Sequence, residues 1–410
     1  MKKIVVLMLA ILMVMSLLAA CSDGSTPTPG ETGKPTDATP GGQDGPSVGE
    51  KIGETLKIGV VCPISGQGAA AGKYITNGVK LIEDRLKAEG GFLVGDTRYP
   101  IEFIYEDNEA KEEITTNVYQ KLINQDNVIA IVGPDMSKCI LAAGPIAQQA
   151  GVVAVGTFTT NEAVTEIGDY IFRACFIDSF QGEVAATYAW EEGYKTAGII
   201  YNNADAYAKG LYESFVNVFE RLGGEIVEVQ AYSGSDVKDY NVQLSKIAAA
   251  NPEVLFIPNM FTEIPLQVQQ ARAVGITSPI IGGDSMDTPD VPNLAGHENI
   301  TGTAYVSAFS AQNPDPVAQE FVKAFRNAYG MDPNSNAVLA YEAAEMILDA
   351  IKRAETIDRK GVRDAFATIT DLQLPSGMVT VAANRNPVKG AAILMFNDGG
   401  VPEFVKNVNP

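Results

Sequence analysis

The stretch IAIVGPDMSKCILAAGPIA, residues 129–147, shows the pattern that decides the fold. An apolar run stops at Gly133 and Pro134, and Ser137 then opens a segment that is predicted to be a helix. A buried strand that turns directly into a helix is the building unit of a parallel sheet covered by helices. Because the first turn of a helix carries unpaired N–H groups, Ser137 stands where a carboxylate can bind. The sequence therefore predicts an α/β fold and a candidate anion site.

Strand-like and helical segments alternate along most of the chain. A first set begins with LKIGVVC at 56–62, and a second begins with TAGIIYN at 196–202. Near-continuous apolar strands between amphipathic helices indicate sheets covered on both faces, and 410 residues exceed what one core usually holds. We therefore expect an α/β protein with two doubly wound parallel-sheet lobes. Three helical segments and two strand-like runs, at 377–381 and 391–398, finish the chain.

The first residues have the pattern of an export signal. Lys2 and Lys3 precede an apolar run and two alanines, which predicts a signal peptide over residues 1–20. The ending LAAC resembles the lipobox of bacterial lipoproteins, which implies that Cys21 is lipidated and becomes the mature N-terminus. The polar composition that follows predicts a disordered linker over residues 21–54. This favours an exported protein, lipid-anchored to the outer face of the cell membrane, over an uncleaved membrane helix.

The composition argues against several classes of function. A formal net charge of −20 repels nucleic acid and anionic lipid surfaces. The single histidine, His297, lies in a polar, turn-like stretch, whereas zinc sites and His-assisted catalysis need histidine in a site. The sequence GQGAAAG at 66–72 misses the spacing of a dinucleotide-binding turn. We therefore expect no metal, no cofactor and no enzymatic activity.

Three cysteines remain besides Cys21. Cys62, Cys139 and Cys175 have no metal-type spacing. Cys139 and Cys175 can pair only where the fold brings them close together, and three buried free thiols are the alternative that we favour.

The loops that follow the predicted strands are polar. They are rich in Ser, Thr, Asn, Asp and aromatic residues, and the clearest read GPDMSK, GTFTTNE, YNNADAY and GGDSMDTPD. Because ligands of open parallel sheets sit beyond the carboxyl ends of the strands, two facing lobes would place these loops around one cleft. Their scarcity of Lys and Arg predicts a small polar or zwitterionic ligand.

The folded part resembles the leucine/isoleucine/valine-binding proteins of bacterial ABC importers, which are periplasmic-binding-protein type I domains. The motifs that carry the resemblance are IGVVCPISG, IEFIYEDNEA, AIVGPDMS, GTFTTNEAVT, YIFRACFIDSFQG, YAKGLYESF, QQARAVGI and IIGGDS, in this order. The resemblance implies a monomer whose lobes close on an amino acid and dock on an ABC permease with its ATPase subunits. It also implies a three-stranded hinge, with crossings near 175–178, 303–307 and 378–383. The implied lobes are residues 55–176 plus 304–380 and residues 177–303 plus 381–410.

The resemblance assigns roles to residues of the strand-end loops. Ser137 and nearby amides would bind the ligand's α-carboxylate, Thr160 would contact the carboxylate or the ammonium, and the Phe158 carbonyl would accept from the ammonium. In the second lobe, Tyr207 contacts the ligand and Asp284 binds the ammonium.

Each of these residues also has a simpler interpretation. Ser137 is then a helix cap and Thr160 a turn hydroxyl, while Tyr207 packs within its lobe and Asp284 is solvated.

The side chain of the ligand is left open by the sequence. Tyr74, Phe158, Tyr207, Met260 and Phe261 are candidates to border it, and Met260 stands where the family commonly has an aromatic residue. The resemblance implies branched-chain amino acids. A sensory module for an amide, urea or amino acid is the alternative, and an enzyme acting on a secreted substrate is a third.

Overall fold

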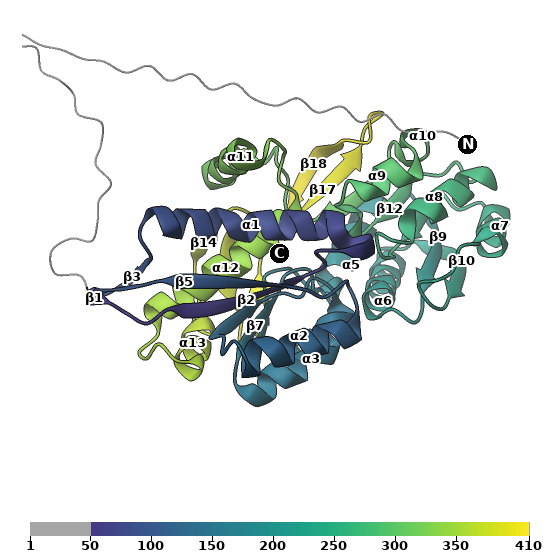
Figure 1. Ribbon diagram of the computed structural model, residues 1–410. Coiled ribbons are helices and arrows are strands. Elements are labelled where there is room, and N and C mark those ends of the chain that lie inside the picture. Colours follow the sequence, from purple (N-terminus) through teal and green to yellow (C-terminus); the bar gives the residue numbers. More distant parts are fainter. Residues whose placement is uncertain (1–50, 410) are drawn as a thin grey trace, which may run out of the picture. The chain divides into compact units, whose positions relative to one another are not determined.

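The computed structural model describes residues 51–409 and shows two largely parallel sheets, each with helices on both faces (Figure 1). The predicted signal peptide, Cys21 and most of the predicted linker lie outside these residues. Within residues 51–409, no helix is long and apolar enough to cross a membrane. The fold class predicted from the sequence is confirmed.

The first lobe is built on a five-stranded parallel sheet with the order β5-β2-β6-β7-β8. The strands are β2 (Leu56–Cys62), β5 (Ile101–Asp107), β6 (Ala130–Val132), β7 (Val153–Gly156) and β8 (Ile171–Arg173). The helices of this lobe are α1 (Ala69–Ala88), α2 (Glu112–Asn124), α3 (Ser137–Ala150), α4 (Ala163–Glu166), α11 (Pro316–Tyr329), α12 (Ser335–Arg353) and α13 (Arg359–Phe366), and the short 3-10 helix η1 (Gly66–Gly68) precedes α1.

Alternation along the buried strands decides which helix covers which face. Val60 and Val132 pack in one cluster with residues of α1, α12 and α13. Their neighbours Val61 and Ile131 pack in another cluster with residues of α2 and α3. Figure 1 shows α1 on one side of β2 and β5, with α2 and α3 on the other. The strands are therefore apolar on both faces, as parallel sheets require.

The second lobe is built on a seven-stranded sheet with the order β10-β9-β11-β12-β13-β17-β18. Its strands are β9 (Thr196–Asn202), β10 (Glu225–Tyr232), β11 (Val254–Ile257), β12 (Ile280–Gly282), β13 (Ala304–Ser307), β17 (Ala391–Phe396) and β18 (Pro402–Val408). Its helices are α5 (Asp178–Glu191), α6 (Ala206–Arg221), α7 (Asn241–Ala250), α8 (Ile264–Ala273), α9 (Asp290–Ala295) and α10 (His297–Ile300), with the 3-10 helix η2 (Asp284–Met286).

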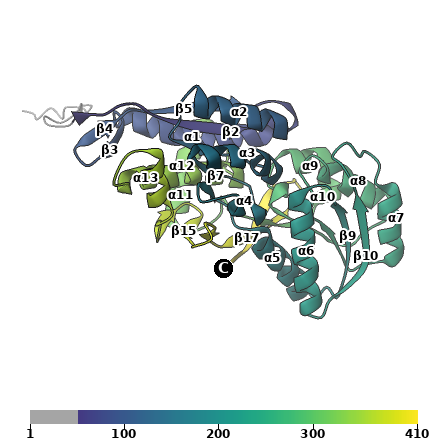
Figure 2. The same cartoon turned by 90° about the horizontal axis from the view of Figure 1, so that it is seen from below.

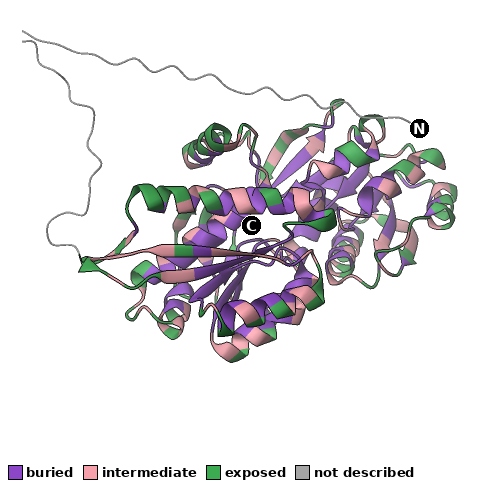
Figure 3. Cartoon of the chain, in the orientation of Figure 1, coloured by how far each residue is buried: buried purple, intermediate pink, exposed green. Residues whose placement is uncertain are grey.

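This sheet is parallel only in part. β17 runs antiparallel to β13, and β18 runs antiparallel to β17. On one face Phe256 stacks on Phe215 of α6, with ring centroids 4.0 Å apart. On the other face Leu255 packs with Leu244 of α7 and Val268 of α8. Figure 2 shows β9 and β10 between α6 and the pair α7 and α8, and Figure 3 shows that the central strands of both sheets are buried.

The first five strands of each sheet have the same spatial order. Taken in chain order they lie as second, first, third, fourth and fifth in both sheets. In each sheet the order reverses next to the first strand, between β2 and β6 and between β9 and β11. Ligands of such sheets bind at this reversal, beyond the carboxyl ends of the strands.

Two smaller sheets border the first lobe. They consist of β1 (Lys51–Ile52), β4 (Thr97–Tyr99) and β3 (Phe92–Val94), and of β14 (Leu372–Leu374), β15 (Gly377–Val381) and β16 (Pro387–Val388). The prediction of a disordered linker as far as residue 54 is therefore wrong at its end. Lys51 N–H donates to the Asp96 carbonyl at 2.9 Å, and this places β1 beside β4.

Two of the predicted lobe boundaries come too early. β13 is hydrogen-bonded to β12, so residues 304–307 belong to the second lobe and the crossing follows Ser307. β16 pairs with β15, and Arg385 and Asn386 both bind Thr165 of the first lobe, so the third crossing follows Val388 rather than residue 380. The first crossing lies between β8 and α5, at the predicted place.

A buried ion pair connects two of the crossings. Lys389 Nζ lies 2.8 Å from Glu342 Oε2 on α12 and donates to the Ala174 carbonyl at 2.9 Å. The side chains of Lys389 and Glu342 are 1% and 0% exposed. Ser376 N–H and Oγ also donate to the Glu342 carboxylate, at 2.7 and 2.9 Å. The pair holds the first and third crossings to α12. Separating its members would leave a buried charge without a partner, which costs free energy.

We predict that Lys389→Met lowers the free energy of unfolding by about 3–5 kcal/mol, because Glu342 then stays buried without a compensating charge. Urea denaturation at 25 °C measures this loss. The control is Lys360→Met, which breaks an exposed pair with Asp364 and should change the denaturation midpoint little. Equal, small effects of the two substitutions would contradict the role of the buried pair.

Candidate ligand-binding site

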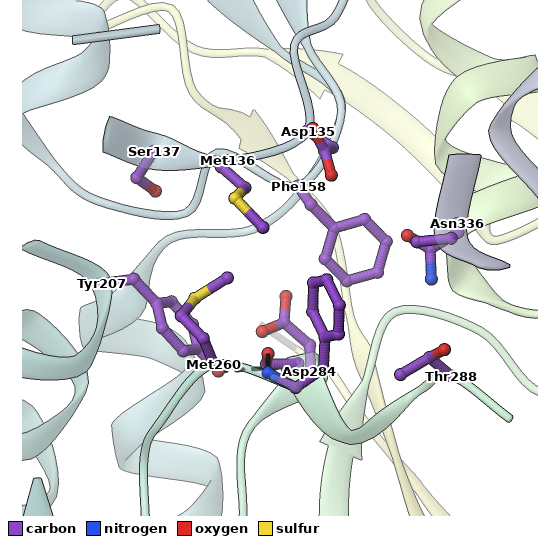
Figure 4. Close-up of a pocket in the computed structure, with 12 residues that line it drawn as sticks. Asp135, Met136, Ser137, Phe158, Tyr207, Met260, Asp284, Thr288 and Asn336 are labelled. Atoms are coloured by element: carbon purple, nitrogen blue, oxygen red, sulfur yellow. Dashed lines mark hydrogen bonds between the residues drawn. The ribbon is translucent and has the colours of Figure 1, made fainter. Parts of the chain in front are cut away.

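A cavity with an empty volume of about 450 Å³ lies where loops of the two lobes meet. Loops of the first lobe and of the second lobe both contribute (Figure 4), and the lining residues are Ala71, Asp135, Met136, Ser137, Phe158, Tyr207, Met260, Phe261, Asp284, Ser285, Thr288 and Asn336. Of the six predicted ligand-binding residues, the cavity includes Ser137, Phe158, Tyr207, Met260 and Asp284 but not Thr160.

Ser137 is the first residue of α3 and is 4% exposed. Gly133, with φ +97°, makes the turn from β6, and a Cβ there would lie 2.2 Å from the Val61 carbonyl oxygen. The Ser137 hydroxyl does not cap its own helix but accepts from Asn161 N–H at 3.3 Å. Since Cys139 and Ile140 N–H already donate to the Met136 carbonyl, the earlier amides of Ser137 and Lys138 are placed as donors for an anion.

The side chain of Arg173 holds the loop that carries Phe158 and Thr160. This fully buried guanidinium donates to the Thr159 carbonyl at 2.6 Å and to the Asn161 carbonyl at 2.8 Å. Thr160 instead faces the first crossing, where its carbonyl accepts from Asp178 N–H at 2.9 Å. Thr160 is not among the residues that line the cavity, and its buried hydroxyl has no hydrogen-bond partner among the described residues. The ligand contact expected of Thr160 stays a prediction.

Tyr207 and Asp284 form the second-lobe side of the cavity. Ser285 N–H donates to the Tyr207 hydroxyl at 3.4 Å, and Asp284 N–H donates to Gln181 Oε1 at 2.7 Å. A Cβ on Gly283 would lie 2.3 Å from the Tyr207 hydroxyl and 2.5 Å from Gln181 Oε1, so a glycine is needed for this close approach. These contacts fix Asp284 at the start of η2, with 2% of its surface exposed.

Asp284 is buried, which excludes the solvated position considered from the sequence. Burial raises the pKa of Asp284 to about 7, although the polar side chains of Tyr207 and Gln181 beside it oppose the rise. Asp284 Oδ2 has no hydrogen-bond partner among the described residues. A buried carboxylate oxygen of this kind is stabilised by a cationic or hydrogen-bonding group in the cavity.

Asp135 is a second buried acid of the lining, and it was not predicted as a site residue. It is 4% exposed, and its Oδ1 has no hydrogen-bond partner within residues 51–409. Burial raises the pKa of Asp135 to about 6, against opposing hydrogen bonds and the nearby charge of Lys138. An acid directly after the apolar run of β6 and two residues before Ser137 was the signal available in the sequence.

Only some of the other lining residues could be predicted from the sequence. Phe261 is confirmed as a cavity residue, whereas Tyr74 borders a neighbouring cavity and stacks on Phe325. Asn336 is missed because it lies in the first turn of α12, about 200 residues after Asp135 in the chain, and gave no local signal. Its side-chain amide donates to the Asp287 carbonyl at 3.0 Å, which fixes it at the edge of the cavity.

Outside the cavity, the described residues offer neither an accessible thiol nor a cluster of metal-binding side chains. Cys62, Cys139 and Cys175 are buried and free, so Cys139 and Cys175 do not pair in this structure. Burial raises the pKa of each of these thiols to about 12. Residues 51–409 contain no group of three or more His, Cys, Asp or Glu side chains that could hold a metal ion.

Two α/β lobes with a cavity between their strand ends, lined by apolar side chains and two buried acids, are the architecture of a solute-binding protein. A family model described as "Periplasmic binding protein" matches residues 55–400. The chain belongs to the periplasmic binding protein family, and the resemblance to its Leu/Ile/Val-binding members is confirmed.

Solved structures and curated relatives agree with this assignment. The branched-chain amino acid transporter substrate-binding protein LivJ of Streptococcus pneumoniae, in complex with isoleucine, is 30% identical with a TM-score of 0.80, over 87% of this chain and 100% of that chain. A leucine-, isoleucine-, valine-, threonine- and alanine-binding protein of Pseudomonas aeruginosa is 25% identical over 327 residues, 79% of this chain and 85% of the relative. A solute-binding protein of Rhodopseudomonas palustris in complex with 3,4-dihydroxybenzoic acid is 25% identical with a TM-score of 0.76, over 87% and 97% of the two chains. These relatives are binding proteins, which supports the expectation that the chain is not an enzyme.

The raised pKa of Asp284 predicts how stability depends on pH when no ligand is present. An exposed aspartate titrates near 3.8, so between about 4 and 7 the folded protein holds a proton that the unfolded chain releases. This contribution to stability is complete below pH 4 and is lost as the pH rises through 7. We predict that Asp284→Asn reduces the fall in the free energy of unfolding between pH 5 and pH 8.

Urea denaturation of the wild type and the variant at the two pH values measures this effect. Asp290→Asn, a substitution in the same lobe outside the cavity lining, is the control and should leave the fall unchanged. An identical fall in the wild type and in Asp284→Asn would show that Asp284 does not titrate in this range.

Proposed function

We propose that the protein is the extracytoplasmic solute-binding component of an ABC importer and captures an α-amino acid between its lobes. The observation that carries this proposal is the placement of Ser137 and Asp284 in one cavity. The N-terminus of α3, with Ser137, offers donors for a carboxylate from the first lobe. Asp284 offers a buried carboxylate for an ammonium group from the second lobe. An α-amino acid carries both complementary groups.

Capture follows from the division of these groups between the lobes. The amino acid first binds the first lobe through its carboxylate, at Ser137 and the neighbouring amides. Closure then brings Asp284 and Tyr207 to the ammonium and to the opposite side of the ligand. Because only contacts that differ between two states shift their equilibrium, the Asp284–ammonium pair favours the closed state. The branched-chain ligands of the relatives support an amino acid, and the closed form would be the one that a membrane permease receives.

Two hydrogen bonds join the lobes beside the cavity. Asn161 of the first lobe donates to the Ala206 carbonyl at 2.9 Å, at the start of α6. Asp287 of the second lobe accepts from Ser335 N–H at 2.8 Å, at the start of α12. These two bridges lie at positions that frame the cavity, and they support closure as the motion that encloses the ligand.

We predict that Asp284→Ala weakens amino-acid binding by about 2–5 kcal/mol, a loss of tens-fold to thousands-fold, because the ammonium is then buried without its acid. Isothermal titration calorimetry measures the affinity for the ligand found in a thermal-shift screen of the twenty amino acids and 3,4-dihydroxybenzoate. Asp290→Asn is again the control and should keep the wild-type affinity. Near-normal affinity in Asp284→Ala, or binding of the aromatic acid alone, would refute an amino-acid site.

Anchoring by Cys21 is part of the same proposal, supported by the lipobox-like LAAC sequence. In a bacterial host, we expect the wild-type chain in the membrane fraction after cell lysis. Cys21→Ser removes the only thiol of that sequence and should abolish incorporation of labelled fatty acid. Equal labelling of the wild type and the variant would exclude lipidation at Cys21.

A further inference from the structure

We propose that the ligand is an amino acid whose side chain carries a hydrogen-bond donor, and that Asp135 is the residue that selects for it. The inference rests on the proposed function and deepens it by naming the class of side chain. It changes the expectation taken from the resemblance, because leucine, isoleucine and valine have no side-chain donor.

The first observation is the state of the Asp135 side chain. Asp135 follows β6 and lines the cavity, and only 4% of its surface is exposed. Its Oδ1 is without a hydrogen-bond partner in the part of the chain that the structure describes. Figure 4 shows the Asp135 carboxyl group on the side of the cavity near Phe158 and Asn336, with Ser137 on the other side of Met136. The donors for the ligand's carboxylate and the acid therefore face different parts of the cavity.

The second observation concerns the residues that line the cavity together with Asp135. Asn336 and Thr288 are further polar residues of the lining, and Asn336 is held in place by its bond to the Asp287 carbonyl. The twelve lining residues include two acids, Asp135 and Asp284, and no Lys or Arg. The α-ammonium of an amino acid can satisfy Asp284, but this leaves the Asp135 oxygen on the other lobe without a donor.

A ligand with a wholly aliphatic side chain would leave the Asp135 oxygen both buried and unpaired. It would exclude water from the cavity and supply no group for Asp135 Oδ1, so the buried oxygen would stay unpaired. A hydroxyl, amide or ammonium group on the side chain would instead donate to it. Sites built to hydrogen-bond a ligand group discriminate strongly against the isostere that lacks the group, because the buried polar atom is then left alone.

Two pairs of isosteric amino acids test the proposal. Threonine and valine have the same shape, as do asparagine and leucine, and only the first member of each pair carries a side-chain donor. After a thermal-shift screen of all twenty amino acids, calorimetry on the wild-type protein should show at least one donor-bearing member binding at least about tenfold more tightly than its isostere. Asp135→Leu should remove or reverse this preference, and Asp135→Asn, which keeps an acceptor oxygen, should retain part of it.

The controls separate selection from general damage to the site. Asp107→Asn alters an acid at the end of strand β5 in the same sheet, outside the cavity lining, and should leave the preference unchanged. Valine or leucine bound as tightly as its isostere by the wild type, with no change in Asp135→Leu, would overturn this inference and leave the proposed function intact. The absence of binding by any of the twenty amino acids would overturn both.

Discussion

A buried carboxylate needs a partner, and the protein leaves a carboxylate oxygen of Asp284 without one. The surrounding structure keeps this oxygen unpaired. Gly283 permits the close approach of Tyr207 and Gln181, whose contacts fix the backbone of residues 284 and 285. Desolvation then makes the carboxyl group hold its proton up to a pKa of about 7. In the proposed function, a ligand with an ammonium group would release this constraint, and that difference between the empty and the filled cavity would be the source of both affinity and closure.

The fold supplies the geometry that brings this acid to an anion site. Both lobes have the same strand order, so both present their reversal point and their strand-end loops. The proposed anion site is the start of α3 in the first lobe, and the acid follows β12 in the second. The buried Lys389–Glu342 pair holds two of the three crossings together, so the lobes are joined at a defined place.

Much of this arrangement could be predicted from the sequence, because local patterns carry it. Apolar runs between amphipathic helices predicted the strands, and the turn at Gly133 predicted the start of α3. The strand β13 was assigned to the wrong lobe because its pairing with β12, and with β17 more than 80 residues later, leaves no trace in the local sequence. Thr160 and Thr159 are adjacent hydroxyls in one loop, and only the position of Arg173 and Asp178 decides where that loop faces. Asn336 reaches the cavity through the packing of α12, which no spacing along the chain reveals.

A crystal structure of the protein with a bound amino acid tests the central claim most directly. The account predicts the ligand's ammonium within hydrogen-bond distance of the Asp284 carboxylate, and its carboxylate at Ser137 and the first amides of α3. A ligand bound in the reverse orientation, or outside the cavity between the lobes, would contradict it.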